Sequence, residues 1–178
     1  WDFSTVNTCP IPNEFKVLIE EYLHTVFESK SEYKGWKIPE TTLVYPWIAR
    51  MYPDIKYIFW VRDPRDCILS GHLTDDLNKF GITYDKTDDI RKNRAISWLY
   101  QREIVRSVPT PKNHLSIKFE DMVFDQDNTL ARISDYLGIP IAKIEMRPDS
   151  VGRYKTDKGE HMFDFFENDM KELGYELE

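Results

Sequence analysis

The chain has 178 residues, of which 41% are hydrophobic and 31% charged, so we expect one globular domain over residues 1–178. Its net charge of −7 argues against a general nucleic-acid-binding surface, although a local basic cluster can still hold an anionic ligand. The sequence has no long apolar run, no signal-peptide pattern and only two cysteines, which predicts no membrane segment and a reducing, cytoplasmic location.

The first clear element is a long amphipathic helix. Over residues 12–27 apolar side chains recur at spacings of three and four, and Pro12 stands where proline favours a helix start. Residues 35–38 are predicted as a short strand. Residues 40–51 are predicted as a helix that Pro46 interrupts or bends.

The most informative segment follows. Residues 55–61 (IKYIFWV) are apolar, rich in aromatic and β-branched side chains, and end at a charged turn, which is typical of a buried strand in a mostly parallel sheet. A helix start comes next, so Arg62 lies at the carboxyl end of the strand and Ser70 about two helical turns along. Ligands bind at that edge of open α/β sheets, and the pair suits a phosphate. Alternatively, Arg62 forms only a surface ion pair with Asp63 or Asp66.

The rest of the chain continues to alternate strands with helices. The predicted elements are a long substrate-contacting loop at 73–89, a helix at 88–108, a strand at 115–119, a helix from Asn128 or Thr129 to Leu137, an irregular segment at 139–158 and a closing helix at 161–173. Strands that alternate with helices imply an α/β layered domain with a parallel sheet, although only three strands are predicted.

Arg62, the following Asp-Pro-Arg-Asp and Ser70 together resemble the 3′-phosphate-binding motif of sulfotransferases that use 3′-phosphoadenosine 5′-phosphosulfate (PAPS). The resemblance implies that both side chains bind the 3′-phosphate of this donor. It also implies a three-layer sandwich with a central, mostly parallel sheet, similar to the fold of the phosphate-loop nucleoside triphosphatases.

Two further segments resemble the same family. Residues 117–122 are similar to its Tyr-Glu-Asp-hydrophobic element, with Phe119 where a Tyr is common, and the run RPDSVGRYK is similar to its C-terminal donor loop. The resemblance implies that Phe119, Arg147, Gly152 and Arg153 contact the donor. The alternatives are a core phenylalanine and a solvated, flexible loop.

The segment Lys37-Ile-Pro-Glu40 resembles the Lys-x-Pro element that precedes the 3′-phosphate motif in many members. Sulfuryl transfer spreads charge over the moving oxygens, so it needs a fixed cation, and a base must take the acceptor proton. Lys37 fits the first role, and Glu40 or His72 fits the second. Alternatively, Lys37 is a solvated strand-end lysine and Glu40 a helix-start acid.

The sequence departs from the family in one respect. Members normally open with a glycine-rich loop that holds the 5′-phosphosulfate, but the first glycine here is Gly35 and no such loop follows. We therefore expect that an N-terminal segment of the fold is missing from this chain; the alternative is a degenerate member.

The expected function is transfer of a sulfuryl group from PAPS to a hydroxyl or amine of a small molecule or glycan, without a metal. The scattered histidines and acidic clusters show no metal-ligand spacing. The acceptor cleft is expected at residues 73–89 and the N-terminal helix. The alternative is a non-catalytic module that binds adenosine 3′,5′-bisphosphate or another phosphorylated ligand. A nucleotide kinase is disfavoured because no Walker-type loop is present.

Overall fold

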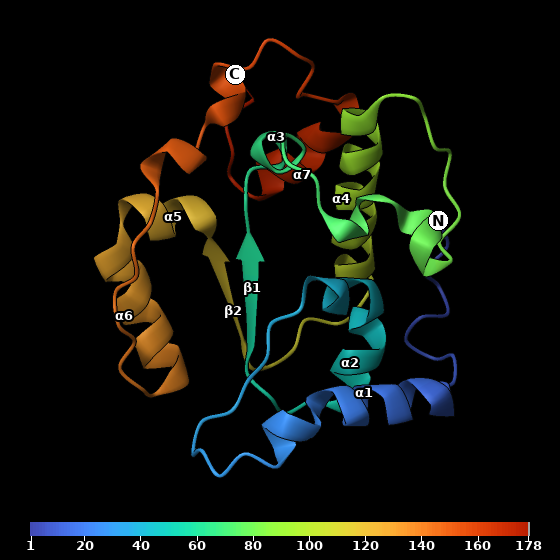
Figure 1. Ribbon diagram of the computed structural model, residues 1–178, viewed down its shortest axis with the longest axis vertical. Helices are drawn as coiled ribbons and strands as arrows, with labels where there is room; N and C mark the ends of the chain where they lie inside the picture. The colour runs from blue at the N-terminus through green and yellow to red at the C-terminus, as the bar shows by residue number, and fades with distance from the viewer. Residues whose placement is uncertain (178) are drawn as a thin grey trace.

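Two parallel strands lie at the centre of the computed structural model, which describes residues 1–177 (Figure 1). Strand β1 (Tyr57–Val61) pairs with β2 (His114–Lys118) in a register that sets Tyr57 opposite His114 and Val61 opposite Lys118. Both strands therefore end at the same edge of the sheet. Their parallel order requires a long crossover connection, which contains helices α3 (Pro64–Cys67) and α4 (Ile90–Arg106).

Seven α-helices surround the sheet: α1 (Asn13–Phe27), α2 (Tyr45–Met51), α3 (Pro64–Cys67), α4 (Ile90–Arg106), α5 (Phe119–Phe124), α6 (Gln126–Leu137) and α7 (Glu167–Glu172), counted over residues 1–177. Six 3-10 turns connect them: η1 (Pro39–Val44), η2 (Leu73–Asp75), η3 (Leu77–Phe80), η4 (Pro148–Ser150), η5 (Arg153–Lys155) and η6 (Asp164–Phe166).

The helices divide into groups around the strands (Figure 1). Helices α5 and α6 lie on the side of β2, while α4 runs along the other side of the molecule. Helices α3 and α7 lie beyond the carboxyl end of β1, and α1 and α2 lie toward its amino end. The carboxyl edge of the sheet, where an α/β domain binds its ligands, thus faces α3 and the C-terminal segments.

The predicted helices at 12–27 and 88–108 are confirmed as α1 and α4. Leu23 of α1 is fully buried and packs with Ile19 and Ile48. Helix α4 begins where Asp89 accepts hydrogen bonds from the backbone N–H groups of Arg91 and Lys92, which is the capping role that favours aspartate at this position. The amphipathic spacing of both helices is the reason that they could be predicted from the sequence.

The predicted strand at 35–38 is wrong. Ile38 has extended backbone angles (φ −135°, ψ 127°), but no strand pairs with this segment. Instead Trp36 packs edge-on against Tyr52, with ring centroids 6.0 Å apart, and the chain enters η1 at Pro39. Within residues 1–177 the sheet has two strands, so the fold is α/β with a small parallel sheet.

The helix after Arg62 is shorter than predicted. Helix α3 ends at Cys67 after one turn, so Ser70 lies in a turn beyond the helix. The guanidinium group of Arg94 packs closely here: its Nη1 donates to the carbonyl of Ile68 (3.0 Å), and a Cβ at Gly71 would lie 2.9 Å from its Nη2. A continuing helix would have to displace this arginine.

Smaller differences concern element boundaries. The predicted bend at Pro46 is confirmed as the change from η1 to α2, whereas the strand predicted to end at Phe119 stops one residue earlier. Helix α6 begins at Gln126, and the closing helix is reduced to η6 and α7. No helix of the described chain is both long and apolar enough to span a membrane.

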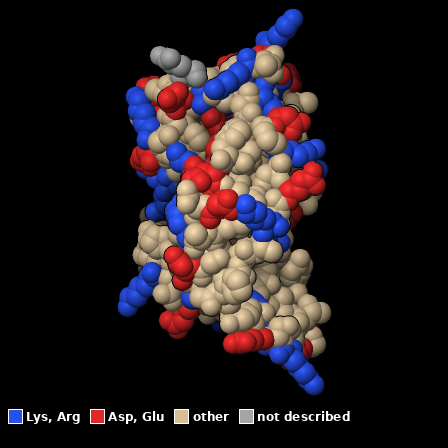
Figure 2. Space-filling model, turned by 90° about the vertical axis from the view of Figure 1, so that its left-hand side faces the viewer, with Lys and Arg blue, Asp and Glu red and all other residues tan. Residues whose placement is uncertain are grey.

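Charges of both signs are interspersed on the face that carries α5 and α6 (Figure 2). Neither sign forms a continuous field there, and large areas are covered by uncharged side chains. Any charge-based recognition on this side therefore depends on individual side chains rather than on a broad patch.

Candidate functional site

Arg62 follows the last residue of β1 and lies where three segments meet. Its guanidinium carbon lies 4.6 Å from the ring centroid of Phe119, the first residue of α5, and its Nη2 donates to the carbonyl of Ser150. The same Nη2 lies 3.9 Å from Oδ2 of Asp66. Its Nε is buried and has no hydrogen-bond partner among residues 1–177. The side chain is held in place but keeps unused hydrogen-bonding capacity.

Asp66 of α3 is the group that joins the two predicted donor segments. Its side chain is completely buried, and its carboxylate accepts hydrogen bonds from the backbone N–H groups of Gly152 (2.6 Å) and Tyr154 (3.2 Å). Gly152 has a φ of +74°, which glycine adopts without strain. One carboxylate thus fixes the C-terminal loop against the β1–α3 turn.

Arg153 completes the contact from the loop side. Its Nη1 and Nη2 each lie 3.1 Å from Oγ of Ser70, and Nη2 also donates to the carbonyl of Asp66 (2.9 Å). Its Nε is a second buried donor without a hydrogen-bond partner in the described chain. We call Arg62, Asp66, Ser70, Gly152 and Arg153 the donor junction.

The chemistry of the donor junction favours an anion. Two guanidinium groups and one hydroxyl gather at the carboxyl edge of the sheet, and each arginine has a buried Nε–H without an acceptor. A buried donor that lacks a partner costs about 1–3 kcal/mol. A phosphate oxygen would satisfy such groups, since guanidinium groups bind phosphate with charge-assisted hydrogen bonds.

The alternative expectation, that Arg62 forms only an ion pair with Asp63 or Asp66, is confirmed only in part, because Arg62 lies near Asp66 but Asp63 pairs with Arg65. Asp63 is paired with Arg65, whose Nη2 lies 2.7 Å from its Oδ2 and whose guanidinium carbon lies 3.9 Å from the ring centroid of Tyr154. Asp66 is within ion-pair distance of Arg62, but its oxygens already accept the loop N–H groups. Neither acid therefore saturates the Arg62 guanidinium.

Two polar side chains, Glu120 and Tyr175, support the turn between β1 and α3 that carries the donor junction. Glu120 accepts hydrogen bonds from the backbone N–H of Asp63 (2.9 Å) and from the hydroxyl of Tyr175 (2.8 Å). Burial, together with the neighbouring Glu120 carboxylate, raises the pKa of Tyr175. Burial also raises the pKa of Cys67 to about 12, so this thiol stays protonated at neutral pH.

Asp66, Glu120 and Tyr175 were not identified as functional from the sequence. Asp66 lies within the Arg62 motif and Glu120 within residues 117–122, and both segments had been predicted to contact the donor. Tyr175 belongs to a C-terminal Leu-Gly-Tyr-Glu run that carried no assigned role. Their function depends on contacts between segments far apart in the chain.

The other predicted site residues lie outside these contacts. Arg147 and Lys37 are exposed, and neither side chain forms a hydrogen bond or ion pair with another described residue. His72 caps η2, where its Nδ1 lies 3.2 Å from the backbone nitrogen of Thr74. Glu40 lines a separate cavity. The structure thus brings together Phe119 and the donor junction.

That cavity, of about 800 Å³, lies between α1, η1, α2 and α4, and we call it the apolar cavity. Among the residues that line it are Phe15, Ile19, Leu43, Trp47, Ile82 and Tyr100. Its walls include both regions that were predicted to form an acceptor cleft, the N-terminal helix and the segment at 73–89.

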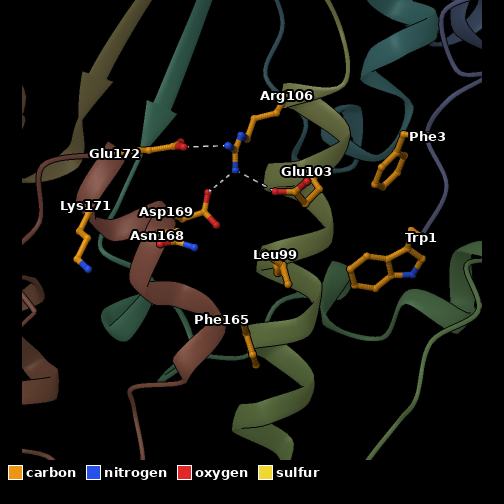
Figure 3. Close-up of a pocket in the computed structure, with 10 residues that line it drawn as sticks. All are labelled: Trp1, Phe3, Leu99, Glu103, Arg106, Phe165, Asn168, Asp169, Lys171 and Glu172. Atoms are coloured by element: carbon orange, nitrogen blue, oxygen red, sulfur yellow. Dashed lines mark hydrogen bonds and ion pairs between the residues drawn. The ribbon is translucent and has the colours of Figure 1, made fainter.

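A second cavity, of about 720 Å³, lies between α4, α7 and the first residues of the chain (Figure 3). Arg106 projects into it and pairs with Glu103, Asp169 and Glu172 at 2.9–3.2 Å. We call it the charged cavity. Its central arginine is already paired with three acids, so it offers no free charge to a ligand.

Within residues 1–177, no group of three or more His, Cys, Asp or Glu side chains is arranged to hold a metal ion.

Comparison with known proteins identifies one family. A model of the sulfotransferase family matches residues 8–143, which is most of the chain. No curated protein and no solved structure gives a significant match. The matched region contains Arg62, Ser70 and Phe119 but ends before Gly152 and Arg153, so this comparison does not cover the contact between the C-terminal loop and the motif.

Proposed function

Because the chain belongs to the sulfotransferase family, we propose that it transfers a sulfuryl group from PAPS to a hydroxyl or amine acceptor. The observation that carries this proposal is the donor junction, in which Arg62 and Arg153, each with an unpartnered, buried Nε–H group, both contact Asp66, and Arg153 also contacts Ser70. We also propose that the fold is related to the three-layer sandwich that the family resemblance implies.

In this proposal Arg62, Ser70 and Arg153 bind the 3′-phosphate of the donor. Gly152 lets the backbone approach the nucleotide closely, Phe119 packs against it, and the exposed Arg147 turns toward the phosphate when the donor binds. The guanidinium groups supply positive charge, so this mode of donor binding needs no metal.

The transfer itself breaks the bond between sulfur and the bridging oxygen of the donor and forms a bond from sulfur to the acceptor. Adenosine 3′,5′-bisphosphate leaves, and the acceptor loses a proton to a base. Lys37 would stabilise the charge on the moving oxygens, and Glu40 or His72 would take the proton.

A second candidate is a non-catalytic module that binds adenosine 3′,5′-bisphosphate. The favouring observation is the absence from residues 1–178 of a glycine-rich loop that could hold a 5′-phosphosulfate. Both candidates require the donor junction to bind the 3′-phosphate, and they differ only in turnover.

Isothermal titration with adenosine 3′,5′-bisphosphate and with 5′-AMP tests the common step. We expect binding that requires the 3′-phosphate and weakens at least about tenfold in Arg62→Ala, since a charge-assisted contact contributes about 1.5–3 kcal/mol. Arg132→Ala on α6 is the matched control and should bind normally. Equal affinity for the two nucleotides, or normal binding by Arg62→Ala, would contradict the proposal. Transfer of radiolabelled sulfate from PAPS then separates an enzyme from a binding module.

A further inference from the structure

The apolar cavity has the size and composition of a small-molecule site. Its volume of about 800 Å³ falls in the range of pockets that enclose drug-sized ligands. Aromatic and aliphatic side chains from α1, η1, α2, α4 and the segment after η3 form its walls. Transfer of an apolar molecule from water into a space with such walls is favourable, because apolar surface is removed from water.

Glu40 is the one charged side chain among the described residues that line this cavity. It is half-buried and forms no hydrogen bond or ion pair with any other residue in the range 1–177. Its carboxylate oxygens are accessible to solvent, and an apolar ligand that excluded solvent from them would have to supply a hydrogen-bond donor instead. Glu40 therefore favours a ligand that brings a hydroxyl or amino group, and it repels a ligand that brings an anion.

The charged cavity shows the opposite arrangement. There every acid that points at Arg106 is paired with it, so the charges hold α4 against α7 (Figure 3). In the apolar cavity the single charge has no such partner.

The position of Glu40 connects the apolar cavity to the proposed chemistry. Ile38 and Glu40 both line the cavity, and Lys37, directly before them, has an exposed side chain. A ligand group at Glu40 thus lies beside the segment that we assign to the transferred sulfuryl group.

We propose that the acceptor is an apolar molecule whose body fills the apolar cavity and whose hydroxyl or amino group donates a hydrogen bond to Glu40. This inference rests on the proposed sulfotransferase function. It narrows the acceptor class, because anionic acceptors such as acidic glycans are excluded by the charge of Glu40 and by the apolar walls.

Three ligands with the same ten-carbon chain test the inference: 1-decanol, decylamine and decanoate. Cys9 lines the cavity and reports occupancy through its rate of alkylation by iodoacetamide. The other cysteine, Cys67, is replaced by Ser so that only Cys9 reacts. We expect decanol or decylamine to slow alkylation at least fivefold, and decanoate at the same concentration to have less than a twofold effect. The difference between decanol and decylamine shows which head group is preferred.

Two variants test whether protection of Cys9 depends on the charge of Glu40 and on the space in the apolar cavity. Glu40→Gln keeps the side-chain size but removes the charge, so decanoate should then protect Cys9 to within about twofold of decanol. Ile82→Trp fills the cavity and should abolish protection by all three ligands. Equal protection by decanoate and decanol in the protein with Glu40, or no protection by any ligand, would overturn the inference.

Parallel titration with adenosine 3′,5′-bisphosphate separates this inference from the proposed function. Arg62→Ala should lose nucleotide binding and retain protection of Cys9 by the preferred ligand, whereas Ile82→Trp should do the reverse. If the nucleotide fails to bind while Cys9 is still protected, the sulfotransferase proposal fails and the acceptor role fails with it. If the nucleotide binds and Cys9 is not protected, only the acceptor class is wrong.

Discussion

The donor junction and the apolar cavity use different physical means to prepare for a ligand. In the donor junction each arginine is fixed by several contacts, and one buried carboxylate holds two segments together. The apolar cavity has a single charge and is defined by the shape of its walls. Directional hydrogen bonds suit a ligand group of fixed geometry, whereas an apolar space selects a ligand by its size and shape.

We expect the largest effect on stability when Asp66, whose carboxylate joins the two segments of the donor junction, is replaced. Asp66→Ala leaves the N–H groups of Gly152 and Tyr154 without acceptors in a buried position, so we expect the free energy of unfolding to fall by about 3 kcal/mol. Urea unfolding measures the change. Asp149→Ala, in the exposed part of the same loop, should cost less than about 0.5 kcal/mol. Similar losses in both variants would show that Asp66 has no special role.

Arg153→Ala should weaken ligand binding at the donor junction and leave ligand binding in the apolar cavity unchanged. We expect a roughly tenfold loss of affinity for adenosine 3′,5′-bisphosphate, because the contact from the loop to the phosphate is removed. Protection of Cys9 by the preferred ten-carbon ligand should not change. Lys155→Ala, an exposed cation two residues along, is the control for loss of charge. A matching loss in Lys155→Ala would indicate general attraction instead of a specific contact.

Tyr175→Phe tests the support behind the donor junction. The hydroxyl that donates to Glu120 is removed, so we expect a loss of about 1 kcal/mol in the free energy of unfolding. Thermal unfolding of this variant beside Tyr33→Phe, at an exposed position, measures it. Nucleotide affinity should change less than it does in Arg153→Ala, and a larger change would place Tyr175 in direct contact with the ligand.

We expect the smallest effect on stability from an ion pair outside both regions, between Arg91 and Asp157. The guanidinium group of Arg91, assisted by the backbone N–H of Gly159, lowers the pKa of Asp157 to about 2. This pKa is lower in the folded than in the unfolded chain, so the pair stabilises the fold above the ordinary pKa of about 4, and this stabilisation is lost as the pH falls toward 2. NMR titration of the Asp157 carboxyl measures the shift, and Arg91→Ala should return it toward 4.

The donor junction could be predicted from the sequence only in part. Arg62 was identifiable because an apolar, β-branched run ends abruptly at a charged turn. The role of Asp66 was not, since its partners Gly152 and Tyr154 lie 86 and 88 residues away and nothing local indicates that contact. Long-range hydrogen bonds to a backbone N–H leave no pattern in a single sequence.

The apolar cavity was even less predictable. Phe15 and Ile19 of α1 have the spacing of any amphipathic helix, and that spacing does not distinguish a side chain in the core from one that lines a space. The region was expected to form an acceptor cleft, but its apolar character was not. The wrong strand at 35–38 has a related cause, because extended, apolar residues become a strand only when another strand pairs with them.

The contact between Asp66 and Gly152 has a consequence for synthesis on the ribosome. The residue that accepts the bond emerges 86 residues before the residue that donates it, which at about 5–20 residues per second is a delay of roughly 4–17 s. Throughout that delay the carboxylate of Asp66 lacks the loop N–H groups that it binds in the folded chain. Until Gly152 has been synthesised, the segment around Asp66 therefore lacks the contact that holds the C-terminal loop against it.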